Sequence, residues 1–178
     1  MASWKSLAID DAAPLFDSFV FDPPTPAIDS NLAVGGVPAA RSLLRVAIPP
    51  QLRDSADVVR ATLILVPVGP VPGARADSFS VQAKAVVADL GAKSPLTTNA
   101  AFFGLETIRL NSSDTLRIEM TNLIRNWAAD TSATTAFMLL QLPEAASYTQ
   151  IRFYSTRAPA FRPALHVTYV RRYAFGVP

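Results

Sequence analysis

The chain has 178 residues, a length that suits one domain with a sizeable hydrophobic core. Half of the residues are apolar, 17% are charged and the mean hydropathy is +0.25, so we expect a partner to cover some apolar surface. The absence of cysteine excludes disulfides, thiol catalysis and cysteine metal sites, and no apolar run is long enough to span a bilayer.

The N-terminal residues 1–16 read as an extension whose apolar side chains pack against the body of the protein or against a partner. They contain no continuous apolar region, which argues against a signal peptide. A first short strand is expected at residues 17–21, followed by a loop at residues 22–31 that three prolines stiffen.

The middle of the chain reads as short strands separated by glycine and proline turns. Gly35-Gly36 predicts a turn, residues 51–57 a polar turn, and residues 89–104 a long irregular segment. Alternation over residues 78–87 places Phe79, Val81, Ala83 and Ala85 on one face. Further strands are expected at residues 42–48, 58–66, 107–110, 116–120, 135–142, 151–154 and 162–170.

The last of these strands is expected to organise the fold. Apolar Leu165, Val167 and Tyr169 alternate with His166 and Thr168, which is typical of a strand with one face toward a core. No strand–helix alternation accompanies it, so a parallel sheet is not expected. The pattern predicts an all-β fold, an antiparallel β-sandwich.

One short helix interrupts the strands, near residues 121–129. Met120, Leu123, Ile124 and Trp127 have the spacing of one helix face. Thr121 is the expected N-cap, because its hydroxyl can accept a hydrogen bond from a free backbone N–H.

Five segments together resemble the DNRLRE-type domain of bacterial secreted and surface proteins. They are Arg41-Ser-Leu-Leu-Arg-Val46, Ala61-Thr-Leu-Ile-Leu65, the step from Ile118 to Trp127, Phe153-Tyr-Ser155, and Arg162-Pro-Ala-Leu-His-Val-Thr-Tyr169. The resemblance implies a jelly-roll-like sandwich, relatives that are mostly non-catalytic, and an extracytoplasmic or cell-surface location. Some related modules bind carbohydrate. The predicted domains are the extension at 1–16, the sandwich at 17–170 and a tail at 171–178.

The charges are unevenly distributed although the net charge is only +2. Residues 1–40 carry five acids and one lysine, whereas residues 151–178 carry five arginines and no acid. Either the two ends neutralise each other, or the arginines form a docking face for an acidic partner or anionic lipid. No nucleic-acid-binding motif accompanies the arginines, so nucleic acid is not expected as a partner.

The residues offer no complete catalytic set. His166 is the only histidine, and a strand residue with no second histidine or cysteine nearby does not indicate a triad or zinc site. The three glutamates are isolated in sequence, and no glycine-rich phosphate loop follows a strand. Calcium is an alternative at the acidic turns, although their spacing is not that of a calcium loop. These turns contain Asp10, Asp11, Asp22, Asp29, Ser30 and Asn31.

Arginines and aromatic residues allow two interpretations each. Arg41, Arg45 and Arg162 could recognise a carboxylate or sugar acid, but structural pairs with carboxylates or carbonyls are favoured. Four aromatic residues could stack on sugars, but Trp127 on the apolar helix face favours the core. These four are Trp127, Phe153, Tyr154 and Tyr169.

We therefore expect a non-enzymatic structural or protein-interaction module, without a cofactor or metal. In this hypothesis it is an extrinsic subunit, membrane-associated or at the cell surface, that stabilises a larger assembly of other protein subunits. The alternative is a carbohydrate-binding module that binds a glycan, and a hydrolase is the least favoured. Aromatic and basic residues in tails and loops are the partner-binding candidates. They are Trp4, Phe102, Phe103, Arg171, Arg172, Tyr173 and Phe175.

Overall fold

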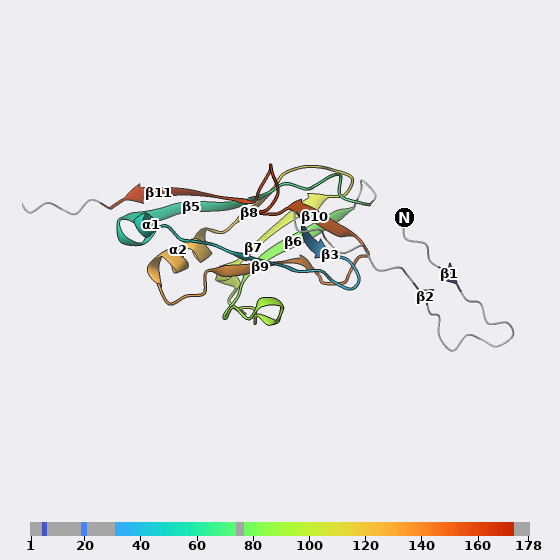
Figure 1. The fold of residues 1–178 in the computed structure, drawn as a ribbon, viewed down its shortest axis with the longest axis horizontal. Helices are drawn as coiled ribbons and strands as arrows, with labels where there is room; N and C mark the ends of the chain where they lie inside the picture. Colours follow the sequence, from blue (N-terminus) through green and yellow to red (C-terminus); the bar gives the residue numbers. More distant parts are fainter. Residues whose placement is uncertain (1–4, 7–18, 21–30, 74–76, 173–178) are drawn as a thin grey trace, which may run out of the picture.

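The computed structural model describes residues 5–6, 19–20, 31–73 and 77–172 (Figure 1). Two short strands near the N-terminus, β1 (Lys5–Ser6) and β2 (Phe19–Val20), pair antiparallel. The expected first strand at 17–21 thus reduces to β2. The rest of residues 1–16 lies outside the described residues, so its predicted packing stays a prediction.

The body of the protein is an antiparallel sandwich, which confirms the predicted all-β fold class. A three-stranded sheet has the order β11-β5-β8 and a four-stranded sheet the order β4-β9-β6-β7, while β10 pairs with β3. The strands are β3 (Asn31–Gly35), β4 (Ser42–Arg45), β5 (Ala56–Leu65), β6 (Ser78–Ala85), β7 (Phe103–Arg109), β8 (Leu116–Glu119), β9 (Ala136–Leu142), β10 (Gln150–Tyr154) and β11 (Ala164–Arg171). The helices are α1 (Pro50–Asp54), α2 (Thr121–Ala129) and the short 3-10 turns η1 (Gly91–Lys93) and η2 (Ala100–Phe102).

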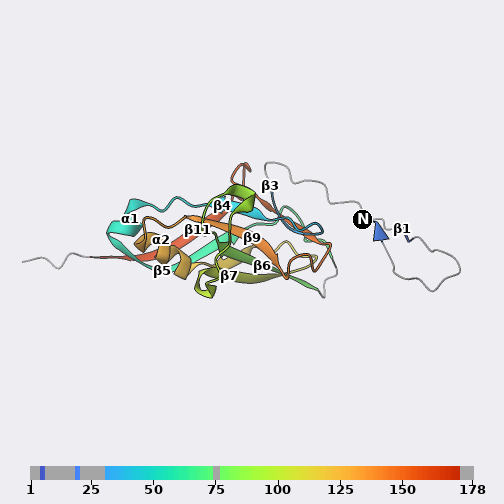
Figure 2. The ribbon, with the colours of Figure 1, turned by 90° about the horizontal axis from the view of Figure 1, so that it is seen from below.

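Helix α2 begins and ends at the predicted residues, 121 and 129. Its buried residues are Leu123, Ile124 and Trp127, three of the four side chains that the spacing placed on one face. The fourth, Met120, is also buried, at the position just before the helix. Figures 1 and 2 both place α2 beside α1, at the end of the sandwich opposite β3 and β10.

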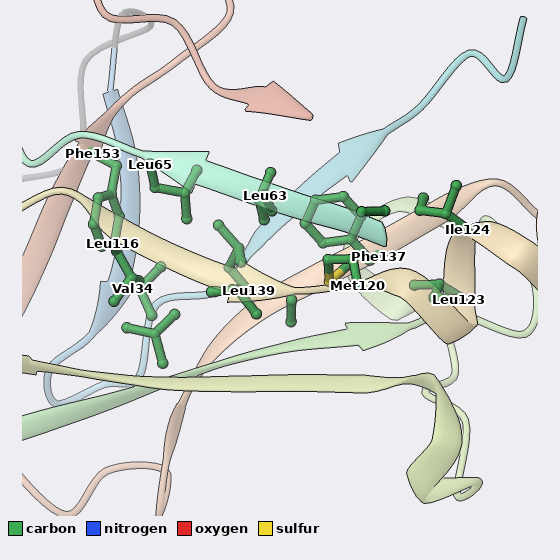
Figure 3. Close-up of a cluster of buried hydrophobic side chains, with 14 of the residues drawn as sticks. Val34, Leu63, Leu65, Leu116, Met120, Leu123, Ile124, Phe137, Leu139 and Phe153 are labelled. Atoms are coloured by element: carbon green, nitrogen blue, oxygen red, sulfur yellow. The ribbon is translucent and has the colours of Figure 1, made fainter. Parts of the chain in front are cut away.

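The core fills the space between the two sheets. Figure 3 shows Leu63 and Leu65 of β5 directed toward the same space as Phe137 and Leu139 of β9. All four are at most 3% exposed. The alternation predicted for β6 is confirmed, because Phe79 and the alternate residues after it are buried in this core.

Strand β9 is covered on both faces. Phe137 and Leu139 belong to the main core, whereas Met138 packs on the other side with Val86 and Ala136. Partly buried Leu43 and Leu96 complete this second cluster. Every residue of β9 except Leu142 is buried, and its residues 136–140 are apolar at successive positions rather than at alternate ones.

The expectation that the last strand organises the fold is wrong. β11 lies at the edge of its sheet and pairs only with β5, which is the central strand (Figure 1). Leu165 and Val167 pack against the core but are only partly buried, and Tyr169 is 44% exposed. The alternation correctly indicated a one-sided strand, but it does not distinguish an edge strand from a central one.

Two further expectations need correction. The polar turn at 51–57 contains helix α1, which begins directly after Pro49 and buries Leu52. The segment at 89–104 is less irregular than predicted, because η1 and η2 lie within it and β7 already begins at Phe103. Pro50 suits the first helical turn, since that position needs no N–H donor.

Candidate functional site

Strands β7 and β8 meet where the two sheets come together along one side of the sandwich. Gly104 of β7 makes this approach possible. A Cβ atom there would lie 2.4 Å from a methyl carbon of Ile118 and 2.6 Å from the backbone oxygen of Glu119. Real side chains do not tolerate such distances, so only glycine allows the two strands to pass this closely. We call this contact of β7 with β8 the seam.

Beside the seam, strand β5 carries a bulge. Thr168 of β11 faces Arg60 and Tyr169 faces Val58, so Val59 has no partner in the register. Arg125 of α2 satisfies the bulged backbone. Its Nε donates to the carbonyl oxygen of Val58 at 2.7 Å and its terminal nitrogen to that of Val59 at 3.1 Å. The helix is thereby fixed to the sheet at the bulge.

A groove of about 540 Å³ opens between the bulge, the seam and the start of α2. We call it the seam groove. Its volume lies in the range that is typical of ligand sites. Val59 and Leu105 are about half exposed at its border, at 49% and 52%. The other principal lining residues are Arg60 from β5, Phe103 from β7, Glu119 from β8 and Leu123 from α2.

Glu119 forms the polar border of the groove. One carboxylate oxygen accepts hydrogen bonds from the hydroxyl and the backbone N–H of Thr121, and the other accepts a 3.1 Å bond from Arg60 Nε. Burial acts to raise the pKa of Glu119, but the hydrogen bonds from Thr121 and Arg60 outweigh it and lower the pKa. The carboxylate is thus held ionised, which suits binding better than proton transfer near neutral pH.

Thr121 does not cap helix α2, so that prediction is wrong. The cap residue is Met120, and Thr121 already belongs to the helix. The Thr121 hydroxyl instead accepts a hydrogen bond from the backbone N–H of Ala61 at 2.7 Å and donates to Glu119. It therefore connects β5 to the start of α2, because a long-range backbone donor competes successfully for the oxygen.

Phe103 lies in the groove, and Phe102 lies beside it. The ammonium group of Lys84 sits 4.5 Å from the centre of the Phe103 ring, a cation–π contact that occupies one ring face. Phe102 lines an adjoining hollow of about 180 Å³ with Trp127 and packs against the core. One of the predicted partner-binding residues thus lines the groove, and a second lines the adjoining hollow.

Of the other predicted partner-binding residues, the two arginines are not at the groove. Arg171 is exposed at the end of β11, one residue beyond the predicted domain boundary. Arg172 follows it, donating to Asp57 at 2.8 Å and to the carbonyl oxygen of Ala56. Neither arginine lines the seam groove or the adjoining hollow. Trp4, Tyr173 and Phe175 lie outside the described residues, so their role stays a prediction.

The three arginines considered for recognition of a carboxylate make structural pairs instead, the interpretation that the sequence favoured. Arg41 binds both carboxylate oxygens of Glu144 at 2.6 Å, and Arg45 binds both of those of Asp89. Arg162 donates to the carbonyl oxygen of Ala158 at 2.7 Å. Arg45 thereby holds a loop residue to the end of β4, whereas Arg41 and Arg162 each join two positions outside the strands.

The residues considered for chemistry are separated in space. His166 is exposed on β11 opposite Thr62, while Trp127 and Phe153 are at most 1% exposed in the core. Tyr154 is half-buried and stands beside Phe161, whose side chain is 63% exposed. Within the described part of the chain, no three histidine, cysteine or acidic residues come close enough to hold a metal ion.

Sequence reasoning missed the groove because its residues come from distant strands. The pair of Arg60 and Glu119 spans 59 positions, and only the antiparallel register of β5 with β8 brings it together. A correct strand pairing would have revealed it, since Thr62 faces Glu119. Arg125 gave no sequence signal, because a bulge cannot be read from the alternation of either strand.

Over the described residues, no helix combines the length and the apolar character that crossing a membrane requires. In comparisons with known proteins, no protein-family model matches the chain, and no curated protein matches it significantly. The resemblance to the DNRLRE-type domain therefore stays a prediction, and the seam groove has to be interpreted from its own geometry.

Proposed function

We propose that this protein is a non-enzymatic interaction module that binds another protein through the seam groove. The observation that carries the proposal is the half-exposed apolar pair Val59 and Leu105, which line the groove together with an aromatic ring, Phe103. Such side chains in a concave site are typical anchors of protein interfaces, where an apolar centre is surrounded by polar groups. The ion pair of Arg60 with Glu119 supplies that polar border.

The same residues argue against catalysis in the groove. Both oxygens of Glu119 already accept hydrogen bonds, and its lowered pKa keeps the group ionised. A general acid or base needs a pKa near the working pH and a free path to the substrate. The backbone around the groove is also fixed by Arg125 and Thr121, which favours a preformed binding surface.

The partner in this proposal is a subunit of a larger assembly, membrane-associated or at the cell surface. The high mean hydropathy of +0.25 supports this, because apolar side chains need cover in the assembled state. The protein would then be an extrinsic component that contributes no membrane-crossing helix from its described residues. Sedimentation of the native extract tests this part: the protein should migrate in a complex much larger than 19.1 kDa.

Site-specific photo-crosslinking tests the groove directly. A photoreactive amino acid replaces Leu105 in one variant and Leu90 in the control, since both are exposed leucines and only Leu105 lines the groove. We expect one discrete crosslinked protein from position 105 in native cells and none from position 90. Phe103→Ser should abolish the crosslink without unfolding the chain. Equal crosslinking from both positions, or none from either, would contradict the proposal.

Carbohydrate binding is a second candidate, which the DNRLRE resemblance suggests and one feature of the structure favours. The rings of Tyr154 and Phe161 lie 5.4 Å apart, and Phe161 is exposed on a backbone with φ +57. That conformation is unusual for a bulky residue and marks a site worth testing. A glycan array decides this alternative: binding that Phe161→Ala removes would support it, and an array without hits would exclude it.

A further inference from the structure

The side of the sandwich opposite the seam ends in a strand with an open edge. β11 has eight residues, six of them exposed, and lies along the outer side of β5 at the upper left of Figure 1. Its backbone pairs with β5 along one edge, and nothing else in the described ranges pairs with the other. In an antiparallel sheet, the N–H and C=O groups of alternate residues point away from the single neighbour. β11 therefore presents a row of free backbone donors and acceptors.

Natural sheets usually protect such an edge, but β11 has little protection. Short length, proline, inward-pointing charge and bulges are the common devices. Pro163 lies just before the strand, and the register irregularity lies only near its end, between Thr168 and Tyr169. The regular stretch from Ala164 to Thr168 contains neither proline nor charge. No residue of this stretch therefore prevents another strand from pairing with its backbone.

The charges around the edge decide what kind of strand fits. Arg162 precedes β11, Arg171 ends it, and no acidic residue occurs from residue 145 to the end of the sequence. Arg172 already pairs with Asp57, so its charge is partly neutralised. Arg171 forms no ion pair with any acid of the described residues. An occupant with carboxylates at both of its ends would complement the edge.

A second copy of this chain fits less well. In an antiparallel pairing centred on β11, Arg171 of each copy would stand opposite Ala164 of the other, close to Arg162. Two sets of like charges would then face each other without compensation, which disfavours the pairing. The same arginines that favour an acidic strand thus discourage self-association.

We propose that the free edge of β11 binds an extended, acidic peptide segment of a partner protein, which adds as a further strand beside β11. Backbone hydrogen bonds to the edge provide the affinity in this binding mode. Arg162 and Arg171 select for acidic ends. The surface is separate from the seam groove, whose lining includes no residue of β11.

The test uses the full chain and a synthetic peptide, Asp-Asp-Thr-Val-Thr-Val-Thr-Asp-Asp, with blocked ends. We expect measurable binding by fluorescence anisotropy at low salt, weakened roughly tenfold or more when asparagine replaces every aspartate. A third peptide keeps the charges but carries N-methyl groups on alternate residues. It should bind at least about tenfold more weakly when the methylated residues face the edge, because it cannot donate there.

Protein variants and hydrogen exchange locate the site. Arg171→Glu should weaken binding about five- to tenfold. Arg117→Glu makes the same charge change at an exposed position on β8 of the same sheet, and should leave binding within about twofold. Bound peptide should slow amide exchange within residues 164–171. Both variants should keep the thermal midpoint of the parent chain.

Several results would overturn the proposal. These are no binding of the acidic peptide up to about 1 mM at low salt, equal binding of the N-methylated peptide, or protection outside β11. A dimer of the free chain that pairs through β11 would make a second copy the occupant and would also contradict it. Failure of this proposal would not affect the proposal for the seam groove, because crosslinking from position 105 is a separate experiment.

Discussion

The two lateral sides of the sandwich are built differently. On the seam side, the missing side chain of Gly104 lets β7 lie against β8, and α2 is fixed to β5 by Arg125. On the other side, β11 follows β5 as an edge strand with most of its residues exposed. The absence of a side chain at Gly104 therefore brings the two sheets into contact on one side, whereas among the described residues no strand pairs with the outer edge of β11.

This difference separates two kinds of recognition. In the proposed binding at the seam groove, the recognition elements are side chains, held in place by the Glu119 and Thr121 hydrogen bonds. In the proposed binding at β11 they are backbone groups, and the flanking arginines select the partner. A partner of the seam groove needs an apolar anchor, whereas a partner of the β11 edge needs an extended acidic segment.

The largest expected contrast comes from removing one aromatic ring on each side. Trp127→Ala should lower the free energy of unfolding by about 3–5 kcal/mol, because it leaves a cavity beneath α2. Tyr169→Ala on β11 should cost less than about 1 kcal/mol, since that ring is 44% exposed. Urea denaturation measures both. Equal losses would mean that β11 is packed as tightly as the seam side.

A smaller effect is expected from adding a single methyl group. Gly104→Ala should destabilise the protein by about 2–3 kcal/mol, because the new Cβ meets the Glu119 backbone oxygen and the strands must separate. Gly69→Ala is the matched control, since a Cβ at that position meets nothing within 4 Å. Thermal unfolding should show no loss for the control. A neutral Gly104→Ala variant would contradict the close contact at the seam.

The next effect tests the bulge in β5. Arg125→Met keeps much of the side-chain length but leaves the carbonyl groups of Val58 and Val59 without their donor, so we expect a loss of about 1–2 kcal/mol. Arg117→Met removes an exposed arginine on the adjacent strand and should change stability by less than about 0.5 kcal/mol. Chemical denaturation of the two variants gives the comparison. Equal losses of stability in the two variants would show that the Arg125 hydrogen bonds contribute nothing.

The smallest effect is expected in the dependence of stability on acidic pH. Because the pKa of Glu119 in the folded protein is lowered below its ordinary value of 4.5, its contribution to stability is present above that value and is lost as pH falls through the folded pKa. The contribution should stay below about 1 kcal/mol, since the side chain is half exposed. Glu119→Gln should flatten this part of the acid profile. An unchanged slope in Glu119→Gln would contradict the assigned hydrogen bonds.

Most of the elements could be predicted from the sequence, but their neighbours could not. The alternation of Phe79 with polar residues and the helical spacing up to Trp127 give local periods, and these persist in the structure. The sequence pattern does not tell an edge strand from a central one, because β11 alternates clearly although it lies at the edge of its sheet. The apolar run of β9 reflects cover on both faces, which depends on Val86 and Leu96 from a distant loop.

The candidate site was predictable only in part. Phe102 and Phe103 were noticed as large aromatic residues in a segment read as irregular, and the structure places them at and beside the groove. Arg60 and Glu119 could not be paired from sequence, because their contact depends on a register between two strands. Long-range pairing, bulges and close approaches are properties of the assembled sheets rather than of any short segment.

Hydrogen exchange of the free, full-length chain tests the central claim, the open edge of β11, most directly. We expect the amides of β9, which is paired on both edges, to exchange slowly, and about half of those in residues 164–171 to exchange orders of magnitude faster. The fast group should follow alternate residues, as one paired edge requires. Uniform slow exchange along β11, as slow as in β9, would contradict the open edge.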